Sequence, residues 1–171
     1  MTEHSASCCT PHTSLGGLSA ADFSAFDVLA VKLHCLDGRF AEPLRQIGVV
    51  FGERMASEQG SRLSADEALS RMLSACGFPS SLESRFLELT PDRARLQVTG
   101  CGEACCPIPP MGRQACGFNA GVFEGFLRGA TGGAWSIEET ACLGLGDSSC
   151  EFLIELDGAS NTPKGGTHVS R

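Results

Sequence analysis

Residues 116–156 read CGFNAGVFEGFLRGATGGAWSIEETACLGLGDSSCEFLIEL, and this stretch decides the fold. In its first part Phe118, Val122 and Phe126 recur at helical spacing. This spacing predicts a helix over about 112–129.

Two short runs follow this helix, 134–142 and 149–156, in which apolar and polar residues alternate. Alternation with a period of two predicts strands. The connection between them, LGLGDS at 143–148, is rich in glycine and predicts a hairpin. We expect Asp147 to form this turn rather than to act as an acid.

The predicted helix carries an unusual glycine pattern. Gly117, Gly121, Gly125 and Gly129 fall every four residues, nearly on one line of its surface. Each glycine inside a helix costs up to about 1 kcal/mol relative to alanine, so close packing must compensate. We expect this line to contact a sheet, another helix or a symmetry-related copy; the alternative is a weakly helical loop.

Upstream of residue 82 the spacing of apolar residues predicts three helices. The first spans about Ala20–Leu36. The second ends by Gly60 and carries an apolar stripe made of Phe40, Leu44, Ile47, Phe51 and Met55. The third begins at a capping box formed by Ser64 and Glu67.

A second hairpin is predicted between residues 82 and 98, with Pro91-Asp92 as its turn. Phe86 is out of phase with Leu87 and Leu89, so we expect the first strand to be covered on both faces. Helices, hairpin, helix and hairpin in this order predict an α+β domain: N-terminal helices packed on an antiparallel sheet, then a glycine-rich helix and a C-terminal metal-binding hairpin.

The length of 171 residues fits one domain with additional tails, given roughly 100–200 residues per domain. Residues 1–17 form a polar tail that contains cysteine and histidine, and residues 159–171 form a second polar tail. We therefore expect a single ligand-binding domain over 18–158.

Composition and charge exclude several classes of protein. The net charge of −7 and the lack of a Lys/Arg cluster argue against a nucleic-acid partner. No run approaches the roughly 18 apolar residues of a membrane span. The N-terminus lacks the basic start and apolar centre of a secretory signal, so we expect a cytoplasmic protein.

Ten cysteines in such a compartment suggest metal binding, redox chemistry or core packing, because disulfides do not persist there. The densest group is Glu139, Cys142 and Cys150, which the hairpin folds together, and Cys116 near the helix start offers a fourth ligand. Residues three apart on a regular strand face opposite sides, so the strand must bend or finish before Cys142. Otherwise Cys142 and Cys150 are buried neighbours and Glu139 is a solvated strand residue.

Three thiolates and one carboxylate carry a formal charge of −4, which a divalent zinc ion reduces to −2. A closed four-coordinate set of this kind is typical of structural zinc sites. Cys116 lies where a helix N-terminus favours a thiolate. Such a site would hold the helix against the hairpin and contribute directly to folding.

The wider pattern resembles the 4-vinyl reductase domain family. The final hairpin has the form Glu-x-x-Cys-x-x-x-Gly-x-x-x-Cys-x-Phe, met here by Glu139, Cys142, Gly146, Cys150 and Phe152. A glycine-rich helix that begins near Cys116 precedes it. The spacing of the four candidate ligands is similar to that of the zinc site in the phenol-sensing regulators that contain this domain.

The resemblance implies a fold related to haem-based nitric-oxide sensors and Golgi-tethering subunits. It also implies a homodimer and a cavity for a small hydrophobic, aromatic or tetrapyrrole-type molecule. Family members include sensing halves of transcription activators and a protein tied to reduction of a bacteriochlorophyll vinyl group. Because no ATPase or DNA-binding module is visible here, we expect any signal to pass to a protein partner.

The sequence indicates no catalytic apparatus. No phosphate loop occurs, and Gly144-Leu-Gly146 lies in a hairpin turn rather than a strand-to-helix turn, so it is not a dinucleotide fingerprint. A hydride source is not identified, and we do not predict reductase activity.

A second cysteine group, Cys101, Cys105 and Cys106, is not explained by the hairpin site. These thiols are candidates for part of an iron–sulfur cluster, for redox-reactive thiols or for the lining of a pocket. Cys8 and Cys9 in the leading tail are candidates for a second metal site.

We therefore interpret the chain as a cytoplasmic sensor domain that binds a small hydrophobic molecule and contains structural zinc. The candidate lining residues are Phe86, Phe118, Val122, Phe126 and Trp135. The alternative is an iron–sulfur or thiol redox accessory protein of tetrapyrrole metabolism that uses Cys101, Cys105 and Cys106.

Overall fold

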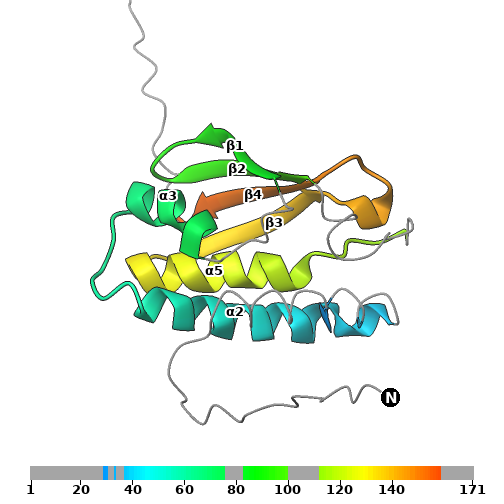
Figure 1. The fold of residues 1–171 in the computed structure, drawn as a ribbon, viewed down its shortest axis with the longest axis horizontal. Coiled ribbons are helices and arrows are strands. Elements are labelled where there is room, and N and C mark those ends of the chain that lie inside the picture. The colour runs from blue at the N-terminus through cyan, green and yellow to red at the C-terminus, as the bar shows by residue number, and fades with distance from the viewer. Residues whose placement is uncertain (1–28, 31–32, 34–36, 76–82, 100–111, 159–171) are drawn as a thin grey trace, which may run out of the picture.

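Three layers make up the described part of the chain: a four-stranded sheet, a helix packed on it, and a second helix beneath the first (Figure 1). The structure is a computed structural model and describes residues 29–30, 33, 37–75, 83–99 and 112–158. The predicted tails and most of the predicted helix Ala20–Leu36 lie outside these residues. The domain boundaries therefore stay predictions.

The sheet contains two antiparallel hairpins. The first consists of β1 (Glu83–Leu89) and β2 (Arg93–Thr99), and the second of β3 (Trp135–Ala141) and β4 (Cys150–Leu156). The strand order is β1-β2-β4-β3, so β4 pairs with both β2 and β3. The predicted α+β class and both predicted hairpins are confirmed.

The face of the sheet toward the helices is apolar. Its alternate residues are buried, in agreement with the period of two. They include Ala94, Leu96 and Val98 on β2, Ile137 on β3, and Phe152 and Ile154 on β4.

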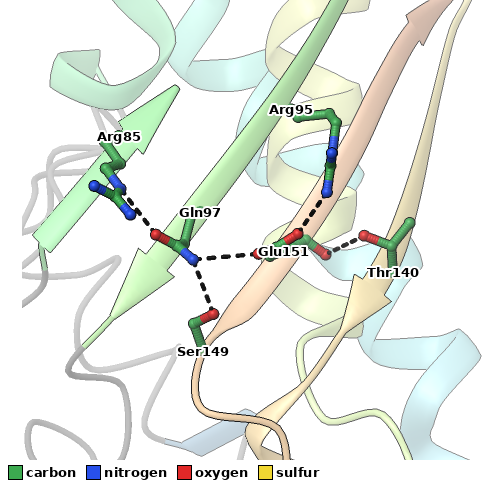
Figure 2. Close-up of polar contacts among 6 residues, drawn as sticks. All are labelled: Arg85, Arg95, Gln97, Thr140, Ser149 and Glu151. Atoms are coloured by element: carbon green, nitrogen blue, oxygen red, sulfur yellow. Dashed lines mark hydrogen bonds and ion pairs between the residues drawn. The ribbon is translucent and has the colours of Figure 1, made fainter. Parts of the chain in front are cut away.

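The opposite face of the sheet carries a polar network that crosses the strands (Figure 2). Glu151 of β4 accepts hydrogen bonds from Arg95 at 2.9 Å and from Gln97 at 3.2 Å. Gln97 accepts a bond from Arg85 of β1 at 2.8 Å and donates one to Ser149 at 3.2 Å. These contacts support the register of the strands, although exposed pairs contribute at most about 1 kcal/mol each.

One prediction about β1 is wrong. Phe86 packs against the core, whereas Leu87 and Leu89 are 42% and 46% exposed. A bulge between Phe86 and Glu88 shifts the register, so the strand has one apolar face and is not covered on both.

The middle layer is α5 (Gly117–Thr131), the helix predicted over 112–129. Ten of its residues are buried, because the sheet covers one side and α2 (Ala41–Ser57) covers the other (Figure 1). The helix begins five positions later than predicted, at Gly117 rather than 112.

The glycine line of α5 lies against α2, which settles the choice among sheet, helix and copy and removes the loop alternative. A Cβ atom added at Gly121 would lie 2.1 Å from the Arg45 carbonyl oxygen, and one at Gly125 would lie 2.0 Å from that of Val49. In return, Gly48 and Gly52 of α2 meet α5 equally closely. Glycine is required on both helices because their backbones are in contact.

The predicted stripe of α2 is only partly buried. Leu44, Phe51 and Met55 are buried, but Phe40 and Ile47 are 40% and 43% exposed. The backbone contact with α5 turns Gly48 and Gly52 inward and rotates Ile47 toward solvent.

Two shorter elements complete the described structure. A 3-10 helix, η1 (Gly38–Phe40), precedes α2. Helix α3 (Ala65–Ala75) begins at the predicted capping box, in which Glu67 Oε2 accepts bonds from the Ser64 amide at 3.1 Å and hydroxyl at 2.8 Å. Within the described part of the chain, no helix is long and apolar enough to span a bilayer.

Candidate metal centre

Four residues predicted to bind a metal converge at the end of the second hairpin. Cys116 is the residue before α5, Glu139 lies in β3, Cys142 follows β3 directly, and Cys150 opens β4. One ligand atom from each residue lies within 4.8 Å of those of the other three. All four side chains are buried, with exposed fractions of 6%, 7%, 0% and 1%.

The strand irregularity required by the spacing is present. The pairing of β3 with β4 shifts register between Glu139 and Ala141, and the strand ends at Ala141. The chain then turns through η2 (Leu143–Leu145). Glu139 and Cys142 consequently reach the same point although three positions separate them.

Backbone amides surround the Cys142 sulfur. Its Sγ atom accepts hydrogen bonds from the amides of Ala115 at 3.2 Å and Gly144 at 3.3 Å. The Cys142 amide donates to the Asp147 carboxylate at 2.7 Å, so Asp147 forms the turn, as expected. These amide donors were missed at the level of sequence; the glycine at 144 was the only local signal for them.

Glu139 is fixed at one oxygen and unpaired at the other. Its Oε2 accepts a bond from the Cys116 amide at 3.3 Å, and its backbone carbonyl accepts one from the Gln114 side chain. Its Oε1 is buried and has no hydrogen-bond partner among the described residues. An unpaired buried carboxylate oxygen is costly, and a bound cation would satisfy it.

The protons of the centre are held tightly in the absence of a cation. Hydrogen bonds with Cys142 and Cys150 raise the pKa of the Cys116 thiol, and burial adds to this. For Cys142 the Cys116 thiol lowers the pKa, but Cys150 and burial outweigh it and raise the pKa to about 12. Burial raises the pKa of Glu139 as well. The expectation that the helix N-terminus lowers the Cys116 pKa is wrong for the metal-free centre, because the thiol neighbours dominate.

The donor set suits a soft divalent cation. Thiolates prefer zinc or iron–sulfur clusters, and four converging ligands match the coordination number of structural zinc. Because the residues come from α5's N-terminus and from both strands of the hairpin, a bound ion would join these elements.

A family comparison supports the same region. Residues 98–156 match the model of the vinyl-4-reductase domain family, and all four candidate ligands fall within this range. The chain carries a vinyl-4-reductase domain. The resemblance stated from the final hairpin and the glycine-rich helix is thereby confirmed.

One curated relative of this vinyl-4-reductase domain chain is the uncharacterized protein MJ1642 of Methanocaldococcus jannaschii, which is 34% identical over 53 residues. The aligned part covers 31% of this chain and 33% of the relative, so the chain matches about a third of the length of that protein.

Two solved structures share the fold of the vinyl-4-reductase domain chain. The phenol-responsive sensory domain of the transcription activator PoxR, with phenol, has a TM-score of 0.56 at 13% identity and covers 81% of this chain and 76% of that one. Subunit 3 of a trafficking protein particle complex from Naegleria fowleri, covalently bound to palmitic acid, has a TM-score of 0.58 at 16% identity and covers 80% and 93%.

The five candidate lining residues of the vinyl-4-reductase domain belong to one core. Phe118, Val122, Phe126 and Trp135 are buried, and Phe86 packs against them as a partly buried residue. The three cavities that we describe in the structure are lined by other residues. The role of these five side chains in ligand binding stays a prediction.

The second cysteine group lies outside the described residues, as do Cys8 and Cys9. The iron–sulfur and redox interpretations of Cys101, Cys105 and Cys106 therefore stay predictions.

Proposed function

We propose that this vinyl-4-reductase domain binds a small hydrophobic molecule and that Cys116, Glu139, Cys142 and Cys150 hold a structural zinc ion. The observation that carries the proposal is the convergence of four buried ligand atoms within 4.8 Å, one of them next to an unpaired carboxylate oxygen. Zinc would replace the thiol protons and satisfy Glu139 Oε1.

The role of zinc in this proposal is structural rather than catalytic. Four protein ligands leave no open position for water or substrate on a tetrahedral ion. Zinc would hold the N-terminus of α5 against the β3–β4 hairpin, and amide donors to Cys142 Sγ would stabilise the negative charge of the cluster. We propose no catalysis.

The small-molecule function rests on the comparisons and on the core. The fold neighbours named above carry phenol and palmitic acid, which are both largely apolar. The predicted lining residues here are aromatic or aliphatic, and Phe118 and Val122 lie on the helix that zinc would anchor. A ligand that separates α5 from the sheet would change how this helix meets its neighbours. A homodimer, a protein partner for signal output and a cytoplasmic location also stay predictions.

Elemental analysis and native mass spectrometry of freshly purified protein test the metal. We expect one zinc ion per chain and a colourless protein. Cys142→Ser should lose the zinc, whereas Cys105→Ser should keep it. Bound iron with visible charge-transfer absorption that disappears in Cys105→Ser would favour the iron–sulfur alternative instead.

Thermal denaturation with phenol, palmitate and protoporphyrin tests the ligand. A ligand at 100 times its Kd stabilises the folded state by about 2.7 kcal/mol, which raises Tm measurably. We expect one of these three classes to raise Tm and to be retained in the native mass spectrum. If none of them does either, the small-molecule proposal is wrong.

A further inference from the structure

A cleft of about 330 Å³ runs along the free edge of β3, between that strand and the N-terminal parts of α2 and α5. Arg45 of α2 donates to the Ile137 carbonyl at 3.1 Å, and Gln114 donates to that of Glu139. These two side chains occupy carbonyl groups of the edge strand, so the cleft borders a well-ordered part of β3.

Glu139 is shared between the cleft and the metal centre. It lines the cleft, whereas none of the three cysteines of the centre does. Its side chain is buried, with 7% of the residue exposed, and its Oε1 lacks a hydrogen-bond partner among the described residues. The cleft therefore reaches the centre on its carboxylate side, while the thiols are enclosed by the core.

The charges of the cleft favour cations. Three of its lining residues are acidic: Glu42, Glu138 and Glu139. Among the described residues that line it, the one basic side chain, Arg45, is neutralised by an ion pair with Glu124 at 2.7 Å. A concave surface of one sign raises the local concentration of the opposite ion and speeds its association about 10- to 1000-fold.

We propose that this cleft is the route by which a divalent cation reaches the four-residue centre, with Glu139 as the first ligand it meets and with Glu42 and Glu138 attracting it. This inference rests on the proposed metal centre. It concerns how the ion arrives and leaves, not whether it binds.

The test compares cationic and anionic attack on the zinc protein. The double variant Glu42→Gln/Glu138→Gln removes two charges and keeps the side-chain shapes. We expect displacement of zinc by Cd²⁺, followed by cadmium–thiolate absorption, to slow about tenfold at low ionic strength. Removal of zinc by EDTA, a polyanion, should accelerate about tenfold in the range where its rate depends on EDTA concentration. The neutral chelator 1,10-phenanthroline should act at an unchanged rate.

The double variant Glu53→Gln/Glu58→Gln is the matched control. It removes the same net charge from the other end of α2, on the order of 16 Å or more from Glu42 along the helix. We expect wild-type rates from it with all three reagents. The differences for the cleft variant should shrink above about 0.1 M salt, where the Debye length falls below about 10 Å.

The outcomes separate the route from the centre. Parallel acceleration by Cd²⁺ and EDTA would indicate general loosening and overturn the route, as would equal effects in the control. Unchanged rates with full zinc content would also overturn the route but leave the centre intact. Wild-type protein that contains no zinc and takes up no Cd²⁺ would instead overturn the proposed centre.

Discussion

The Sγ atoms of Cys116 and Cys150 lie 3.4 Å apart in the core, although the residues are 34 positions apart in the chain. Cys116 precedes the central helix and Cys150 opens the strand that pairs with both neighbours in the sheet. Two neutral thiols at this distance contribute little to stability, whereas a shared cation would join the helix to the sheet.

Replacing one of these sulfurs should therefore be costly. Cys150→Ser is expected to lose the metal and to lower the free energy of unfolding by more than about 3 kcal/mol, or roughly 6–12 °C in Tm. Cys8→Ser, outside the centre, should retain metal and Tm. The measurements are metal content and differential scanning calorimetry; a fully metallated Cys150→Ser protein with wild-type Tm would contradict the assignment.

Neighbouring glutamates on β3 offer a matched pair. Glu139→Gln should weaken zinc affinity at least about tenfold, because a charged ligand becomes neutral, whereas Glu138→Gln should change affinity far less. In the metal-free protein the order reverses: Glu139→Gln should be neutral or stabilising, since it removes a buried carboxyl group. Competition with a chromogenic chelator and urea denaturation report the two effects. Equal affinity losses for both variants would argue against Glu139 as a ligand.

The contact between α2 and α5 predicts a strong response to one methyl group. Gly125→Ala would place a Cβ atom 2.0 Å from the Val49 carbonyl oxygen, so the helices must separate. We expect a loss of about 1–3 kcal/mol or more in urea denaturation. At Gly117 the nearest atom would be 3.3 Å away, and Gly117→Ala should cost much less, because its gain in helix propensity offsets the crowding. The reverse order would contradict the glycine contact.

The metal-free protein should lose stability in alkali. The pKa of Cys142 is raised from 9.0 to about 12, and that of Cys116 is raised too, so the folded state holds these protons more tightly than the unfolded chain does. Their contribution is complete below pH 9 and is lost as the pH rises from 9 toward 12. Urea denaturation of EDTA-treated, reduced protein measures this. Cys142→Ala should flatten the profile, and a flat wild-type profile over the same range would refute the account.

Local patterns predicted most elements of the fold. The spacing of Phe118, Val122 and Phe126 predicted α5, and the capping box of Ser64 and Glu67 predicted the start of α3, because helical periodicity and caps involve residues within one or two turns. Errors arose where tertiary contacts override a period. The bulge beside Leu87 and the exposure of Ile47 both follow from partners far away in sequence.

For the candidate centre, the amino-acid sequence by itself determined which donors are available and that a hairpin would bring Glu139, Cys142 and Cys150 near one another. The tertiary structure alone decided that Cys116 meets them, that amides of Ala115 and Gly144 point at the Cys142 sulfur, and that an acidic cleft reaches Glu139. The physical reason is range: turn and strand preferences act over a few residues, whereas the approach of α5 to the hairpin depends on burial of the whole core and on glycines that let α2 and α5 touch.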